Sequence, residues 1–267
     1  MKILIVGGGN MGKTYADSFI DNYSVSKDDL YILEKLEEKV EYFKSIGFQN
    51  VFFKPDSYIS EMDLIILAIK PQDTSIVFPL IADYITENQV VLSIMAGVKM
   101  VNIEQALPKA KKIIRAMPNL PAQVGMGMTG FTSAKSVSKE EVFMVHNLLN
   151  TTGKCLYFDD ESKLDAVTAI SGSGPAYVYF FMDSMIETAM QMGFSKVQAE
   201  LLVEQTFLGA VHLQNTSKLT CKEWISRVAS KGGTTEAALK KFTELDLAKG
   251  IGEGLHDAHK RAVELGK

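Results

Sequence analysis

The first residues that could carry chemistry form a glycine-rich turn near the start of the chain. A short aliphatic run, Ile3–Val6, is typical of a strand buried on both faces, and it leads directly into GGGNMG. This segment fits the pattern G-x-G-x-x-G, and the residues after it, up to about Ile20, have the apolar spacing of a helix. In this strand–turn–helix context, the pattern predicts that the pyrophosphate of a dinucleotide binds at the helix start.

Each glycine of this pattern has a separate expected role. Gly7 allows a sharp turn, and Gly9 has no Cβ, so a phosphate can approach the backbone. Gly12 allows the helix to pack close to the strand. The free N–H groups and the dipole of the helix that begins near Met11 favour a bound anion. The alternative is a glycine-rich turn that binds no ligand.

A second segment with chemical character, VASKGGTTE, covers Val228–Glu236. Its two glycines break the chain, and Thr234 or Thr235 is expected to cap a new helix with Glu236 in the first turn. A glycine–glycine–threonine helix start presents bare N–H groups, which suit a carboxylate.

A third segment, SGSGP at Ser171–Pro175, interrupts a helical pattern with serines, glycines and a proline. The proline can begin a new helical turn, and the glycines permit close approach of another backbone or a ligand. On composition alone, this segment and Val228–Glu236 also fit ordinary helix–helix loops.

An α/β domain over residues 1–160 is expected to position the first of these segments. Strand patterns occur at Ile3–Val6, Leu30–Leu33, Val51–Phe53, Leu64–Ile69, Val90–Met95, Lys112–Met117, Gly125–Phe131 and Cys155–Phe158. Helical patterns separate most of these runs, including Glu34–Ile46, Asp73–Tyr84 and Lys139–Asn150. Alternation of this kind predicts a mostly parallel sheet of roughly eight strands.

Residues 161–267 carry no convincing strand pattern and are expected to form a separate, all-helical domain. The expected helices are Lys163–Met192, Lys196–Gln214, Cys221–Ser230, Thr235–Thr243 and Leu247–Leu265. The run AYVYFFMDSMI at Ala176–Ile186 is apolar on more than one face, so it must be buried. A domain of this size buries such a helix best against another subunit, which predicts an obligate dimer; packing within one subunit is the alternative.

Charged residues near the predicted strand ends bear on the choice of cofactor. Glu34 follows the second strand at about the position of an acid that binds the adenosine ribose. Its carboxylate would repel a 2′-phosphate, whereas Lys35 would attract one, so both NADH and NADPH stay open. An exposed acid at the start of a helix is the alternative for Glu34. Lys70 either neutralises a phosphate or is simply solvated.

Small residues and an amide lie at other strand ends. Ala96 and Gly97 follow the fifth strand and would allow a flat nicotinamide ring to lie against the backbone. Asn119, between two prolines, offers an amide for hydrogen bonding. The residues expected to contact the dinucleotide are therefore Gly7, Gly9, Asn10, Met11, Gly12, Glu34, Lys35, Ala68, Lys70, Pro71, Met95, Ala96, Gly97 and Asn119.

Composition excludes several classes of protein. The 267 residues carry a net charge of −4 without a basic cluster, which argues against a nucleic-acid partner. No signal peptide is recognised and no apolar run approaches the length of a membrane span. Two lone cysteines, Cys155 and Cys221, fit a reduced, cytoplasmic protein. His256 and His259 have no third ligand nearby, so no metal site is expected.

Six segments together resemble the pyrroline-5-carboxylate reductase family over essentially the whole chain. They are the glycine loop, AIKPQ at Ala68–Gln72, MAG at Met95–Gly97, RAMPN at Arg115–Asn119, SGSGPAY at Ser171–Tyr177 and VASKGGTT at Val228–Thr235. The resemblance implies a Rossmann domain followed by a helical dimerisation domain, with the active site at the dimer interface. It implies reduction of the cyclic imine 1-pyrroline-5-carboxylate to L-proline by NADPH or NADH, the last step of proline biosynthesis. Some members assemble dimers into decamers.

The resemblance also suggests roles for individual residues. Hydride transfer converts a protonated imine into a neutral amine, so positioning matters more than strong acid catalysis. The backbone N–H groups of Gly233 and Thr234 would hold the substrate carboxylate, and Thr235 Oγ1 would contact the ring nitrogen as the catalytic group. The expected substrate-binding residues are Ser171, Gly172, Gly174, Gly232, Gly233, Thr234 and Thr235.

One departure and two rival interpretations accompany this resemblance. Many relatives have proline where this chain has Lys231, which affects the stiffness of the loop and not the reaction. The hydroxyacid dehydrogenases have a similar plan but carry a catalytic lysine after their SGSGP-like turn, and this chain has no lysine between Ser171 and Gln191. A nucleotide-binding sensor without catalysis has no evident need for the second glycine-rich site.

Overall fold

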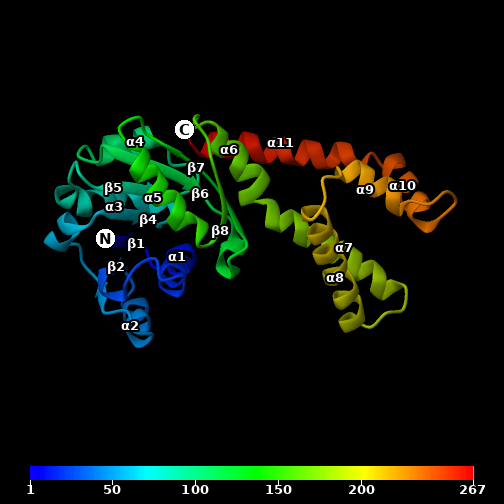
Figure 1. Ribbon diagram of the computed structural model, residues 1–267, viewed down its shortest axis with the longest axis horizontal. Coiled ribbons are helices and arrows are strands. Elements are labelled where there is room, and N and C mark those ends of the chain that lie inside the picture. Colours follow the sequence, from blue (N-terminus) through cyan, green and yellow to red (C-terminus); the bar gives the residue numbers. More distant parts are fainter. Residues whose placement is uncertain (267) are drawn as a thin grey trace. The chain divides into compact units, whose positions relative to one another are not determined.

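The computed structural model describes residues 1–266, and the chain divides into two compact units (Figure 1). Met1–Gly174 and the residues from Ala258 onward form the first unit, and Pro175–Asp257 form the second. The sequence predicts a domain boundary after residue 160, before helix α6 (Lys163–Val167). In the structure, α6 belongs to the first compact unit.

An eight-stranded sheet forms the centre of the first unit, as the sequence predicts. Its strands are β1 (Ile3–Val6), β2 (Leu30–Leu33), β3 (Asn50–Phe52), β4 (Leu64–Leu67), β5 (Val90–Ser93), β6 (Lys112–Met117), β7 (Gly127–Ser133) and β8 (Gly153–Tyr157). Their spatial order is β3-β2-β1-β4-β5-β6-β7-β8, and every neighbouring pair is parallel except β6 and β7. The order reverses between β1 and β4, which is the position where ligands collect in doubly wound sheets.

The strands are apolar on both faces because helices cover both. Successive side chains of a strand point to opposite faces, so Ile3 and Ile5 enter one hydrophobic core, whereas Leu4 and Val6 enter the other. The first core is completed by residues from α1 (Asn10–Asp21), α2 (Glu37–Ser45) and α5 (Lys139–Asn150). The second is completed by residues from α3 (Thr74–Ile81) and α4 (Met100–Ala106).

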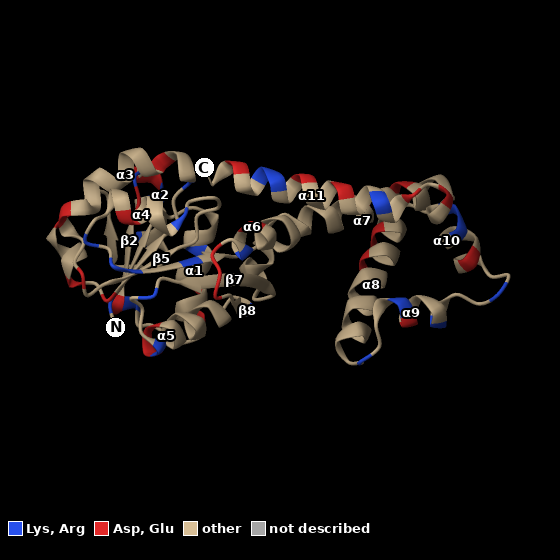
Figure 2. Cartoon of the chain, turned by 90° about the horizontal axis from the view of Figure 1, so that it is seen from above, with Lys and Arg blue, Asp and Glu red and all other residues tan. Residues whose placement is uncertain are grey.

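The second unit is entirely helical, as expected. It contains most of α7 (Gly174–Gln191), all of α8 (Lys196–Asn215), α9 (Cys221–Val228) and α10 (Thr234–Glu244), and the first part of α11 (Leu247–Leu265). Long stretches of α7 and α8 carry neither acidic nor basic side chains (Figure 2). No helix within residues 1–266 combines the length and the apolar character needed to cross a bilayer.

Several element boundaries differ from the sequence prediction. The helix α4 was not expected, and the second helix begins at Glu37 and not at Glu34. The expected helix Asp73–Tyr84 is α3 flanked by 3₁₀ turns. Within the expected helical stretch Lys163–Met192, a π-helical turn, Thr168–Gly172, overlaps the glycine-rich segment that the sequence indicates as an interruption.

Candidate functional site

The glycine turn has the geometry that its sequence predicts. Gly7 has a φ of +103°, a left-handed value that favours glycine, and a Cβ there would lie 2.9 Å from the carbonyl oxygen of Ala68. A Cβ on Gly12 would overlap the carbonyl oxygen of Gly7, so close contact between helix and turn requires glycine. By contrast, the space beside Gly9 is open, with no atom within 4 Å of a Cβ position.

The start of helix α1 is prepared for an anion. Gly9 is the residue before the helix and, having no side chain, leaves the N–H groups of the first turn without a side-chain cap. The helix has 12 residues, so its dipole adds positive potential at this end. These features fit a pyrophosphate approaching over Gly9.

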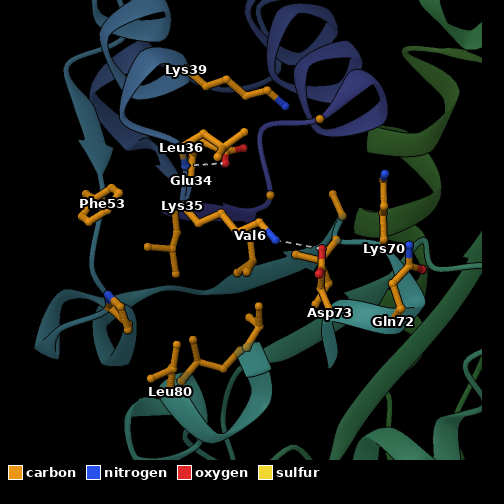
Figure 3. Close-up of a pocket in the computed structure, with 18 residues that line it drawn as sticks. Val6, Glu34, Lys35, Leu36, Lys39, Phe53, Lys70, Gln72, Asp73 and Leu80 are labelled. Carbon is orange, nitrogen blue, oxygen red and sulfur yellow. Dashed lines mark hydrogen bonds and ion pairs between the residues drawn. The ribbon is translucent and has the colours of Figure 1, made fainter. Parts of the chain in front are cut away.

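A cavity of about 370 Å³ lies at the carboxyl ends of β1, β2 and β4 (Figure 3). Its lining includes the expected cofactor residues Gly7, Gly9, Glu34, Lys35, Ala68 and Lys70. It also includes residues that the sequence analysis did not single out: Leu36, Lys39, Phe53, Gln72, Asp73 and Leu80. A usable sequence signal existed for three of these, since Leu36, Phe53 and Asp73 lie at or within a few residues of a predicted strand end. The cavity is at the reversal of strand order, so its place and lining fit an adenosine half of a dinucleotide.

Glu34 joins the glycine turn to the second strand. Its side chain is buried, with one carboxylate oxygen accepting a hydrogen bond from Gly8 N–H at 2.8 Å. The other oxygen accepts one from Leu36 N–H at 2.9 Å. Glu34 is therefore not the exposed first residue of a helix, and that alternative is wrong.

Lysines and an aspartate border the same cavity. Lys35 Nζ lies 3.2 Å from a carboxylate oxygen of Asp73, which joins the end of β2 to the segment after β4 (Figure 3). Lys39, from the first turns of α2, also lines the cavity. Lys70 is exposed and immediately precedes a 3₁₀ turn begun by Pro71. The cavity is thus bordered by both positive and negative groups.

The segment after β5 is shaped by the end of helix α11. Gly97 has a φ of +75°, and a Cβ there would lie 3.1 Å from the carbonyl oxygen of Leu265. Met95 and Gly97 are buried, and Ala96 is partly exposed. Gly97 is therefore required for close packing of α11 in addition to any contact with nicotinamide.

Asn119 and Ser171, which lie far apart in the sequence, meet in the first unit. Asn119 Nδ2 lies 3.2 Å from both the carbonyl oxygen and the Oγ of Ser171. Ser171 and Gly172 are the last two residues of the π-helical turn, and Gly174 begins α7. The structure thus brings one expected cofactor residue against the first expected substrate residue.

The segment Gly232–Thr235 lies in the second unit at the start of α10. Gly232 has a φ of +73°, and Gly233 is the residue that precedes the helix, so the expected cap at Thr234 or Thr235 is wrong. The carboxylate of Glu236 accepts a hydrogen bond at 2.6 Å from the N–H of Gly232, which lies one residue before Gly233. Gly233 has no side chain, so no side chain caps the N–H groups of the first turn of α10. Gly233 N–H donates to the carbonyl oxygen of Ser230 at 3.0 Å.

The fold and this site define a class of protein: a nicotinamide-dinucleotide oxidoreductase with an added helical domain. A family profile described as pyrroline-5-carboxylate reductase dimerisation matches residues 161–265, and one described as NADP oxidoreductase, coenzyme F420-dependent, matches residues 2–97. The reductase of Aquifex aeolicus is 34% identical over 99% of this chain and 97% of its own length. The chain belongs to the pyrroline-5-carboxylate reductase family.

Solved structures agree with this assignment. The pyrroline-5-carboxylate reductase of Coxiella burnetii is 31% identical, with a TM-score of 0.90 over 100% of this chain and 98% of its own. The pyrroline carboxylate reductase of Plasmodium falciparum, solved with NADP bound, is 25% identical with a TM-score of 0.90 over the same shares. The expected fold class is confirmed.

Proposed function

We propose that this chain reduces 1-pyrroline-5-carboxylate to L-proline with NADPH or NADH, the last step of proline biosynthesis. The observation that carries the proposal is 34% identity to a named reductase over nearly the full length of both chains. The chain also retains, in order, the SGSGPAY and GGTT segments that are specific to the family.

The residues present fit a dinucleotide. When bound, the cofactor supplies a hydride to the imine carbon of the substrate. The open space at Gly9 and the uncapped start of α1, at Asn10 and Met11, suit the pyrophosphate. The adenosine side is assigned to Glu34, Lys35, Ala68, Lys70 and Pro71, and the nicotinamide side to Met95, Ala96 and Gly97.

The substrate is assigned to the two glycine-rich segments. Thr234 is the first residue of α10, so its N–H precedes the hydrogen-bonded part of the helix and is available to the substrate carboxylate. Gly233 N–H already donates a hydrogen bond to the carbonyl oxygen of Ser230. It must break this bond before it can donate to the substrate carboxylate. Thr235 Oγ1 contacts the ring nitrogen and stabilises its protonated form, whereas Ser171, Gly172 and Gly174 shape the surface beneath the ring. Gly232 provides the left-handed turn that orients this helix start.

The chain is proposed to act as a cytoplasmic homodimer without a nucleic-acid partner, and dimers can assemble into a higher homo-oligomer such as a decamer. Support comes from the dimerisation profile over residues 161–265 and from the exposed apolar side chains of the second unit. Its partner in the reaction is a small cyclic imine.

An assay of NADPH oxidation and of NADH oxidation tests the function directly. The loss of absorbance of the reduced nicotinamide is the measured signal. We expect oxidation that depends on added 1-pyrroline-5-carboxylate and yields proline. The ratio of kcat/KM for the two cofactors, measured again in Lys35→Ala, shows which charge governs the ribose site. Tight cofactor binding without oxidation that depends on the imine would instead favour a nucleotide sensor.

The role of Thr235 has its own test. Removing a hydroxyl that contacts the reacting group typically costs about 100-fold in kcat/KM, so Thr235→Ala should lose roughly that factor. Thr243→Ala is a matched control near the other end of α10, where the hydroxyl donates to the carbonyl oxygen of Leu239. Full catalytic efficiency in Thr235→Ala would remove the assigned role.

A further inference from the structure

The side chain of Asn119 connects three segments of the first unit. It follows β6 and Pro118, and its Nδ2 contacts both the carbonyl oxygen and the Oγ of Ser171 at 3.2 Å. Its Oδ1 accepts a hydrogen bond from Met128 N–H at 2.8 Å, at the start of β7. The amide is therefore directed at protein atoms on both of its ends, which leaves it poorly placed to serve a ligand.

The segment that Asn119 holds has an unusual backbone. Thr168–Gly172 forms a π-helical turn, closed by a hydrogen bond from Ser173 N–H to the carbonyl oxygen of Thr168 at 2.9 Å. Turns of this type are uncommon and occur frequently at functional sites. A Cβ on Gly172 would lie 2.6 Å from the terminal methyl of Met117, the last residue of β6, so this turn packs tightly against the end of that strand.

A second anchor fixes the other end of the same segment. Arg115, also on β6 and 2% exposed, lies 3.0 Å from a carboxylate oxygen of Glu161 and 3.7 Å from one of Asp165. The same oxygen of Glu161 accepts a hydrogen bond from Met100 N–H at 2.8 Å. The stretch from Glu161 to Gly172 is therefore held at both ends: Arg115 of β6 contacts Glu161 and Asp165, and the amide of Asn119, two residues after β6, contacts the π-helical turn.

From this arrangement we infer that Asn119 is a positioning residue: its amide holds Ser171 and the adjoining glycine turn in the geometry that the reaction needs, and it does not contact the cofactor. The inference rests on the proposed function for the role of Ser171, and it replaces the direct cofactor contact expected for Asn119. A displacement of about 1 Å at a reacting group can cost roughly 100-fold in rate, so one amide is enough to matter.

The variant Asn119→Asp isolates this role. Aspartate keeps an oxygen that accepts from Met128 N–H, but it faces the carbonyl of Ser171 without a donor. We expect kcat to fall by about 10- to 100-fold, because the substrate-side turn is released. The dissociation constant for NADPH or NADH, measured by calorimetry without the imine, should change by less than about threefold, because no cofactor contact is lost.

Asn50→Asp is the matched control. Asn50 also donates through Nδ2 to a backbone carbonyl, that of Asp28 at 2.9 Å, but it is the first residue of β3 and contacts an unrelated 3₁₀ turn, Lys27–Asp29. We expect its kcat and cofactor affinity to match the unsubstituted protein, which shows that loss of an amide donor alone is not responsible.

Hydrogen–deuterium exchange provides a readout that does not depend on turnover. In Asn119→Asp, peptides that cover residues 168–174 should exchange faster, and peptides from β1 to β5 should not. Unchanged exchange in 168–174, full kcat, or a cofactor affinity that falls in parallel with kcat would each overturn the inference. If the unsubstituted protein fails to reduce the imine, the proposed function is wrong, and the exchange experiment still decides whether Asn119 holds Ser171.

Discussion

The two units differ in how far their apolar side chains are buried. In the first unit, the sheet residues Ile5 and Leu92 are fully buried between layers of helices. In the second unit, Phe180 on α7 is 71% exposed and Leu201 on α8 is 65% exposed. Across the described part of α7, α9 and α10, no residue is buried.

This contrast shows which half of the chain can complete a core alone. A sheet covered on both faces buries its apolar residues within one chain, whereas the helices of the second unit lie with large apolar surfaces uncovered. An apolar patch of this extent marks a protein interface, which agrees with the dimerisation profile over these residues. The first unit should therefore respond to mutation as a monomer does, and the second as an oligomer does.

The largest expected effect comes from a charge on the exposed face of α7. Phe180→Glu should dissociate the dimer, because burial of one phenylalanine is worth about 2 kcal/mol and the change occurs in both chains. The total of about 4 kcal/mol corresponds to a roughly 1000-fold increase in the dissociation constant. Analytical ultracentrifugation over a range of concentrations measures this directly.

Phe143→Glu is the control for that experiment. Phe143 lies on α5 of the first unit and is 65% exposed, close to the exposure of Phe180. We expect no change in its oligomeric state, because the proposed interface lies in the second unit. Equal dissociation of the dimer in Phe143→Glu and Phe180→Glu would contradict the assignment of the interface to the second unit.

Truncation of one leucine in each unit should have a somewhat smaller effect, on thermal stability, and it compares the two units directly. Leu92→Ala leaves a cavity between β5 and its helices and should cost about 3 kcal/mol, or roughly 6–12 °C in Tm. Leu201→Ala on α8 should cost about 2 kcal/mol, but only while the dimer is formed. Thermal melting at several protein concentrations separates them: the deficit of Leu201→Ala should grow on dilution, and that of Leu92→Ala should stay constant.

The smallest effect concerns a charge that acts within the first unit alone. Burial would raise the pKa of Glu141, but hydrogen bonds from Lys112 at 2.7 Å and from Ser138 lower it overall. Because this pKa is lowered in the folded state, the stabilisation is present above the unfolded pKa and is lost as pH falls through the folded one. Glu141→Gln should therefore cost about 1 kcal/mol at neutral pH and less in acid, with dimerisation unchanged.

Urea unfolding at neutral and acidic pH measures this dependence on Glu141. Glu244→Gln in the second unit is its control, since Glu244 pairs with Lys241 at 3.3 Å on an exposed part of α10. Exposed pairs contribute little, so we expect no resolvable change there at either pH. A loss at Glu141 that does not diminish in acid would contradict the assignment to its charge.

Much of the fold could be predicted because it depends on local patterns. The run Ile3–Val6 and the glycines after it determine a strand, a turn and a helix start within a few residues. Helix α4 was missed because it has seven residues and no side-chain cap of its own. Its first N–H, that of Met100, is bonded by Glu161, which lies 61 positions away.

Part of the cavity lining was predictable from the sequence, but the contacts that its residues make were less so. The position of Glu34 after β2 indicated a ribose contact, but the partner of its carboxylate, Gly8, is set by the folded turn 26 residues earlier. The contact between Asn119 and Ser171 spans 52 positions and has no sequence signal. The expected threonine cap of α10 is wrong because glycine also suits the residue before a helix, and Gly233 occupies that position.

Helix α11 begins in the second unit, and its residues from Ala258 onward belong to the first. On the ribosome, these residues are made only after all of the second unit has been translated. The turn at Gly97, which packs against Leu265, must therefore wait for that helix while most of the protein already exists. A nascent chain can form its sheet early, but the packing of α11 against Gly97 forms only after the second unit has been made, so a product that stops within the second unit would lack it.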